Sequence, residues 1–182
     1  YILYFLVAIT MVLQGCDFGD TNINPAKSTD ATVDQILPVA EAQAARNIGA
    51  IGGRVTGCIM QHFEGIDAQP EGYSNYIIDE NTLNSFWGSG LYSGTMKDCI
   101  IISQKATEEN KPHYKAIAQI LLAQSLGIAT SFWGDIPYTE AFNFSTTLKP
   151  KYETQAFIYQ KIQQLLDSAI QNINLPPSLT PP

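Results

Sequence analysis

Two cysteines and two histidines in the middle of the chain are the residues best suited to bind a metal or to act as nucleophiles. Cys58 and Cys99 lie in segments whose pattern predicts helix interiors, and neither His62 nor His113 has a cysteine or carboxylate partner at metal-site spacing. We therefore expect no metal centre. Buried free thiols are the expected state of both cysteines, and a disulfide stays possible if two helices place the sulfur atoms face to face.

Two pairs of carboxylates, Glu64 with Asp67 and Asp79 with Glu80, have the chemistry that a glycoside hydrolase uses. Both pairs fall in segments expected to be loops of an acidic protein, and nothing in the sequence places either pair in a pocket. The chain also has no glycine-rich phosphate loop, nucleophile elbow or dinucleotide-binding fingerprint. The sequence therefore does not predict an enzyme, and we expect no cofactor.

A polar segment contains two aromatic residues that could bind a neutral ligand. Tyr73, Asn75 and Tyr76 lie in an expected loop with no helical stripe to bury them. An exposed aromatic ring covers the apolar face of a sugar, and a neighbouring amide both donates and accepts hydrogen bonds. We predict these three residues as candidate ligand-binding residues, with ordinary packing within the loop as the alternative.

The third cysteine, Cys16, lies directly after the uncharged apolar segment 1–13 (YILYFLVAITMVL). This segment is too short for an ordinary transmembrane helix but has the length of the hydrophobic region of a signal peptide. Leu13-Gln14-Gly15-Cys16 resembles a bacterial lipobox, although Gln14 departs from the usual small residue. We predict a truncated signal peptide over 1–15 and lipidation of Cys16; the alternative is a buried N-terminal helix with a core cysteine.

The predicted anchor continues into a tether. Residues 16–31 comprise the predicted lipidated cysteine and a stretch rich in Asp, Asn, Gly and Pro, which is typical of extended chain. Acyl chains on Cys16 would hold the folded part, residues 32–182, at a membrane. The sequence starts with Tyr1 rather than Met and stops in the proline-rich LPPSLTPP, so we expect both ends to be truncated.

Composition excludes several classes of partner. The chain of 182 residues has a formal net charge of −7 and no basic cluster that could neutralise phosphates. Nucleic-acid binding and docking on anionic lipid through a polybasic face are therefore not expected. The hydrophobic fraction of 45% is normal for a folded domain.

Four long amphipathic segments predict helices. The first is one interrupted helix, or two helices in line, that begins after a capping box at Thr32 and Gln35 and ends at Gly65. Residues 66–82 read as a loop, and a second helix follows from about residue 84 until the polar residues 107–111. The third runs from Pro112 to a stop at Gly134, and the fourth from about Glu153 to Ile173.

These helices lead to the predicted fold class. No segment has the alternation of a convincing strand. We predict an all-α fold of antiparallel helical hairpins of tetratricopeptide-like type, in which each pair buries an apolar stripe against its neighbour.

Two aromatic motifs allow both a structural and a sugar-binding interpretation. In Trp133-Gly134-Asp135-Ile136-Pro137-Tyr138, Gly134 ends a helix, Asp135 can accept from freed backbone donors, and the aromatic rings can pack the corner. Trp87 and Tyr92 recur at core-like helical spacing. We favour packing over sugar stacking for both motifs.

Several of these motifs together resemble the SusD/RagB family of Bacteroidetes outer-membrane lipoproteins. The resemblance is carried by SFWGDIPYTEAF at 131–142, PKYETQAFIYQKIQQLLDSAIQNI at 150–173, FWGSGLY at 86–92 and NPAKSTDATVDQILPVA at 24–40. It covers the chain after Cys16 and matches the N-terminal part of longer proteins. It implies a helical, lipid-anchored protein at the cell surface that works with a TonB-dependent transporter resembling SusC.

The resemblance also implies the function that we expect. Such a protein captures glycans or other nutrient oligomers for the transporter, without covalent chemistry, and much of the ligand site lies in the C-terminal part. The alternative is a helical-repeat scaffold of the envelope that assembles proteins and binds no sugar. A glycan-degrading enzyme is a third possibility.

Overall fold

The computed structural model describes residues 30–79, 81–143 and 147–176. The fold described below is that of the unit Thr32–Pro182. The predicted signal peptide, Cys16 and most of the tether lie outside the described residues.

The first long helix is continuous but changes its type along its length. It consists of α2 (Val33–Arg46), the π-helix η2 (Asn47–Gly52) and α3 (Gly53–Ile59). The predicted capping box is confirmed, because Thr32 and Gln35 exchange side-chain and backbone hydrogen bonds at the start of α2. The helix ends at Ile59 and not at Gly65, since Gln61 takes a left-handed φ of 57° that a helix cannot continue.

A short helix, α4 (Ala68–Ser74), lies inside the segment 66–82, so the prediction of a loop there is wrong in part. The side chain of Asp67 accepts from the Ala68 N–H over 2.8 Å at the start of this helix. Tyr73 from α4 packs with Val55 and Cys58 of α3 in a small second core. That contact stabilises a seven-residue helix that would be marginal alone.

The remaining long helices follow the sequence predictions closely. They are η3 (Phe86–Met96), which continues into α5 (Lys97–Glu108), then α6 (Pro112–Trp133) and α7 (Gln155–Ile173). Gly134 ends α6 with a φ of 74°, as expected of a glycine at this place. The last helix begins two residues after the predicted Glu153, because Thr154 is its N-cap and accepts from the Phe157 N–H.

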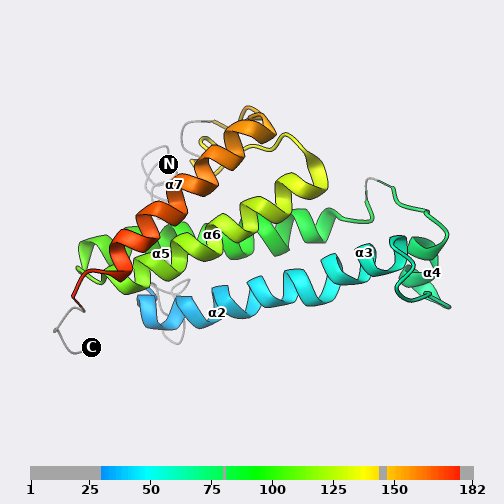
Figure 1. Cartoon of the computed structure of the whole chain (residues 1–182), viewed down its shortest axis with the longest axis horizontal. Helices are drawn as coiled ribbons and strands as arrows, with labels where there is room; N and C mark the ends of the chain where they lie inside the picture. The colour runs from blue at the N-terminus through cyan, green and yellow to red at the C-terminus, as the bar shows by residue number, and fades with distance from the viewer. Residues whose placement is uncertain (1–29, 80, 144–146, 177–182) are drawn as a thin grey trace, which may run out of the picture. The chain divides into compact units, whose positions relative to one another are not determined.

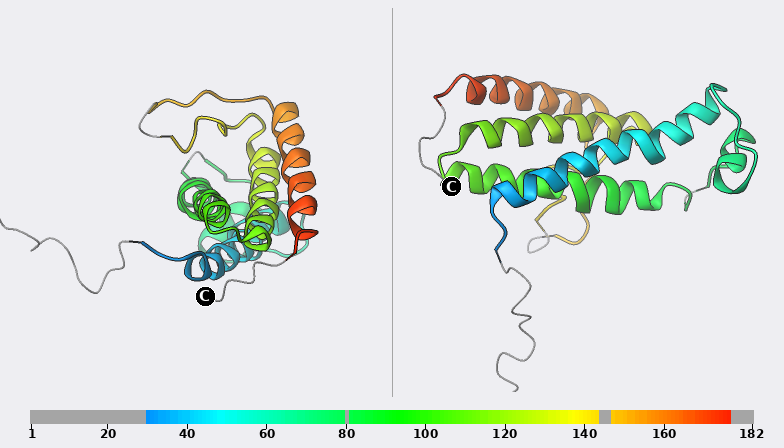
Figure 2. Two further views of the ribbon diagram at one scale, coloured as in Figure 1. Left: turned by 90° about the vertical axis from the view of Figure 1, so that its left-hand side faces the viewer. Right: turned by 90° about the horizontal axis from the view of Figure 1, so that it is seen from below.

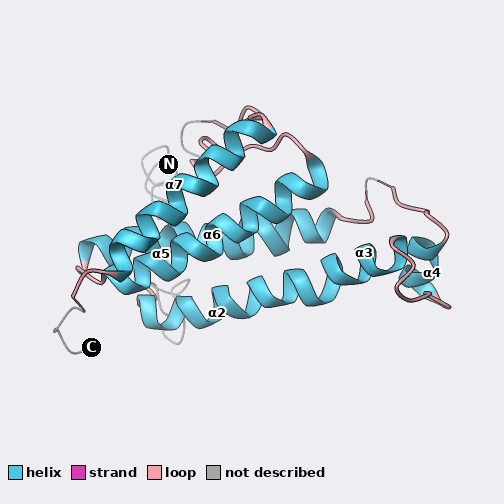
Figure 3. Ribbon diagram, viewed as in Figure 1, coloured by secondary structure: helices cyan, strands magenta, loops and turns pink. Residues whose placement is uncertain are grey.

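Consecutive long helices run antiparallel, and α6 lies between α5 and α7 (Figures 1 and 2). The first helix packs against η3, α5 and α6. Apart from one isolated bridge between Ile136 and Glu153, the described residues contain no β-structure (Figure 3). The structure therefore confirms the all-α fold of helical hairpins.

The main core lies where these helices meet. It buries large apolar side chains from every long helix, among them Val33, Phe86, Leu91, Met96, Ile102, Leu126 and Ile158. Among the described residues, only α6 is long and apolar enough to cross a membrane. Half of its apolar window is buried against neighbouring helices, which accounts for its hydrophobicity.

Candidate functional site

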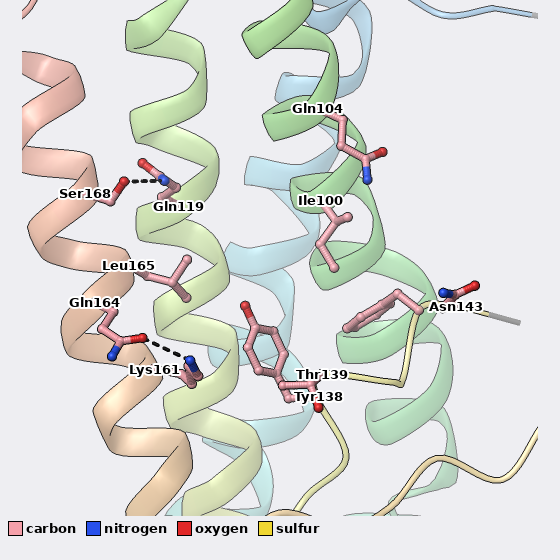
Figure 4. Close-up of a pocket in the computed structure, with 11 residues that line it drawn as sticks. Ile100, Gln104, Gln119, Tyr138, Thr139, Asn143, Lys161, Gln164, Leu165 and Ser168 are labelled. Atoms are coloured by element: carbon pink, nitrogen blue, oxygen red, sulfur yellow. Dashed lines mark hydrogen bonds between the residues drawn. The ribbon is translucent and has the colours of Figure 1, made fainter. Parts of the chain in front are cut away.

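An open groove lies between α5 and α7, with α6 behind it and the connector between α6 and α7 as one wall (Figure 4). Its volume is about 800 Å³. Most of its lining side chains are neutral and polar, namely Gln104, Gln119, Tyr138, Thr139, Asn143, Gln164 and Ser168. A second hollow of about 500 Å³ shares five of its lining residues, including Gln119 and Tyr138, and extends it along α5.

Hydrogen bonds between α6 and α7 fix one side of the groove. The buried amide of Gln119 donates to Ser168 Oγ over 2.9 Å and accepts from Asn172 Nδ2 over 2.9 Å. Lys161 Nζ donates to Gln164 Oε1 over 3.1 Å, one turn along α7. These side chains are therefore held in place before any ligand arrives.

The connector wall depends on Glu153, a buried carboxylate. Its backbone pairs with Ile136 through N–O distances of 3.0 and 3.1 Å, and its side chain accepts from the N–H groups of Tyr138 and Thr139 over 3.2 and 2.9 Å. Tyr138 thus points into the groove between α5 and α7 (Figure 4). Sequence reasoning took Glu153 for the first residue of a helix and missed this role, since no local pattern marks a carboxylate that binds a distant backbone.

The chemistry of the groove suits a neutral ligand that is rich in hydroxyl groups. Amides and hydroxyls both donate and accept, and burial raises the pKa of the Tyr138 phenol, which keeps its proton. Among the described lining residues of the 800 Å³ groove, the only charge is that of Lys161, and there is no carboxylate. A pair of acidic residues for glycoside hydrolysis is therefore not present there.

The three predicted ligand-binding residues lie elsewhere, at and after the end of α4. The expectation of an exposed ring is wrong for Tyr73, which is 2% exposed and packs in the second core. Asn75 is exposed at the C-cap of α4. Tyr76 is 59% exposed, and its hydroxyl donates to the Ile59 carbonyl oxygen and accepts from Gln61 Nε2, each over 3.3 Å. Asn75 and Tyr76 stay candidates, and Tyr73 supports them from beneath.

The aromatic motifs pack as predicted. Trp87 lies 4.6 Å from Tyr92 and 4.9 Å from Trp133 between ring centroids, and the Tyr92 hydroxyl donates to the Pro137 carbonyl oxygen over 2.7 Å. Burial raises the pKa of Tyr92. Asp135 accepts from the Gln155 N–H over 2.9 Å, as expected of a corner residue. These rings join η3 to the end of α6.

Both central cysteines are free thiols in buried positions, in two different core clusters. Burial raises the pKa of Cys99 to about 12, so its thiol is not a nucleophile at neutral pH. His113 Nε2 lies 3.0 Å from the Leu175 carbonyl oxygen, and His62 is exposed. Within the part of the chain that the structure describes, no three His, Cys, Asp or Glu side chains come together as a metal site would require.

Comparison with known proteins places this fold in a family. Residues 25–179 match the model of the SusD-like family described as starch-binding and associating with the outer membrane. No curated protein matches. A crystal structure of a SusD/RagB family protein from Bacteroides thetaiotaomicron has 26% sequence identity and a TM-score of 0.69 over 81% of this chain. The aligned part is 32% of that protein, so the chain spans about a third of its length.

The family match covers most of the chain, and the structural match covers 81% of it. The structural match agrees with the helical fold described above. The chain therefore belongs to the SusD-like family of proteins, whose description is starch binding in association with the outer membrane.

Proposed function

We propose that this protein is a lipid-anchored, cell-surface protein that binds glycans or other nutrient oligomers and delivers them to a SusC-like TonB-dependent transporter. The observation that carries the proposal is the family match over residues 25–179. The groove, most of whose lining side chains are hydroxyls and amides, supports binding of a hydroxylated ligand. The whole-protein activity is part of the proposal, because the chain corresponds to about a third of its solved relative.

The binding step would use hydrogen bonds and stacking without covalent chemistry. Tyr76 offers an exposed ring whose hydroxyl is tied to Gln61 and Ile59, so its orientation is fixed in advance. Asn75 lies beside it with an exposed amide. We assign these two residues to ligand contact and the groove between α5 and α7 to the same class of neutral ligand.

Calorimetric titration of the full-length protein with maltoheptaose and a panel of other neutral oligosaccharides tests ligand binding. Tyr76→Ala should weaken binding by roughly 2–10-fold, the loss that one aromatic contact gives. Tyr152→Ala is the matched control, since Tyr152 is 66% exposed and lies outside both candidate sites. Equal affinities of the two variants would remove Tyr76 from the site, and no heat with any oligosaccharide would contradict glycan binding.

A reducing-end assay on the same mixtures tests the absence of catalysis. The described residues that line the groove include no acid–base pair, so the concentration of reducing ends should stay constant over days. Its steady increase with protein concentration would instead indicate the glycan-degrading enzyme.

The anchor is tested by Cys16→Ala in cells, with Cys58→Ala as the control. The first variant should move from the membrane fraction to the soluble fraction and lose incorporation of a labelled fatty acid, because one cysteine would supply the attachment. The buried Cys58 has no such role, and its variant should stay membrane-bound. Unchanged fractionation of Cys16→Ala would contradict the anchor.

Delivery to a transporter is tested by purification of the tagged full-length protein from outer membranes in mild detergent. A SusC-like protein should co-purify in a fixed ratio. Co-purification of other envelope proteins without any transporter would favour the scaffold alternative.

A further inference from the structure

We draw no further inference here: the strongest candidate, the apolar pocket of about 290 Å³ between η3 and the connector from α6 to α7, lined by Trp87, Tyr92, Pro137 and Phe142 among others, lies open in a chain that spans about a third of its solved relative, and nothing in the structure shows what covers it.

Discussion

The side-chain amide of Asn47 donates to the carbonyl oxygen of Gly90 over 3.0 Å and to Thr95 Oγ1 over 3.1 Å. These bonds join two π-helical segments, η2 and η3, that are far apart in sequence. Asn47 and Thr95 are both buried. The side-chain oxygen of Asn47, Oδ1, accepts from Gln43 Nε2 over 3.0 Å. In a π-helix the backbone hydrogen bonds span five residues instead of the four of an α-helix. The Asn47 side chain adds hydrogen bonds between the two π-helical segments.

Replacement of Asn47 by alanine should therefore destabilise the protein. Asn47→Ala leaves the buried groups that it paired without their partner, which costs about 1–3 kcal/mol of the free energy of unfolding. Urea denaturation measures this value. Ser89→Ala is the control, since the exposed Ser89 hydroxyl on η3 bonds only a backbone carbonyl four residues earlier. A loss no larger than that of the control would contradict the role of Asn47.

A methyl group at position 90 should conflict with the same amide. A Cβ atom on Gly90 would lie 2.7 Å from Asn47 Oδ1, closer than real Cβ contacts allow. Gly90→Ala should lower the free energy of unfolding by about 1–3 kcal/mol. In the Asn47→Ala background the clash is gone, so the same change should cost clearly less there, and a double-mutant cycle measures the difference. Additive losses would show that the two positions do not interact.

The buried carboxylate of Glu153 gives the third prediction. Glu153→Gln keeps the shape of the side chain, but it removes the charge that strengthens the bonds from the N–H groups of Tyr138 and Thr139, and it puts an NH₂ group where the second oxygen accepts from the Thr139 hydroxyl. The expected loss is about 1–3 kcal/mol, measured by thermal and urea unfolding. Glu140→Gln is the control, because Glu140 pairs with Lys151 at the surface over 3.8 Å and should change stability little. A loss equal to that of the control would mean that the connector does not depend on Glu153.

Two isoleucines on α7 test the orientation of that helix. Ile158 is fully buried and Ile170 is 58% exposed. Ile158→Ala should destabilise the protein by about 2–5 kcal/mol through lost burial and the cavity left behind, whereas Ile170→Ala should cost well under half as much. Chemical denaturation of both variants makes the comparison. Similar losses of stability in the two variants would show that the face of α7 with Ile158 is not the one that packs against α6.

Asp34 should make stability depend on pH. Its carboxylate accepts from the Tyr114 hydroxyl and from Lys111 Nζ, and mainly the bond from Tyr114 lowers the pKa of Asp34 below its ordinary value. A pKa that is lower in the folded state adds stability above the ordinary pKa of about 4, and this stability is lost as pH falls through the folded pKa.

The difference in stability between wild type and Asp34→Asn should therefore be largest near neutral pH and shrink below about pH 4. Urea denaturation at pH 7, 5 and 3 measures it, with Asp167→Asn, an exposed residue on α7, as the control. A difference that grows as the pH falls would reverse the sign and contradict the assignment.

Local signals predicted the long helices well because each helix end has its own physical mark. Pro112 fits the first turn of α6, Gly134 takes the positive φ that ends it, and Thr32 with Gln35 starts α2. The apolar stripes between these ends predicted that the helices pack in pairs as hairpins. The packing of Trp87 and Tyr92 also followed from their helical spacing, and that of Trp133 from its place at the corner after α6.

The features that the sequence analysis missed depend on contacts between distant segments. The segment of α4 contains Pro70 and Gly72 and reads as a loop, and it becomes a helix where Tyr73 packs with Val55 and Cys58. The buried state of Tyr73, which corrects one of the predicted site residues, has the same origin. The π-helical segments and the carboxylate of Glu153 likewise satisfy groups that no window of neighbouring residues can reveal.

The bridge between Ile136 and Glu153 closes the connector at its base. The packing of α6 against α7 therefore depends little on which residues lie between these two positions. Tyr138, Thr139 and Asn143 are among those residues, and they form the wall of the groove. Loops tolerate substitution, insertion and deletion better than the elements they connect. During divergence, substitutions in the connector can therefore reshape this wall of the groove without a compensating change in the helical scaffold.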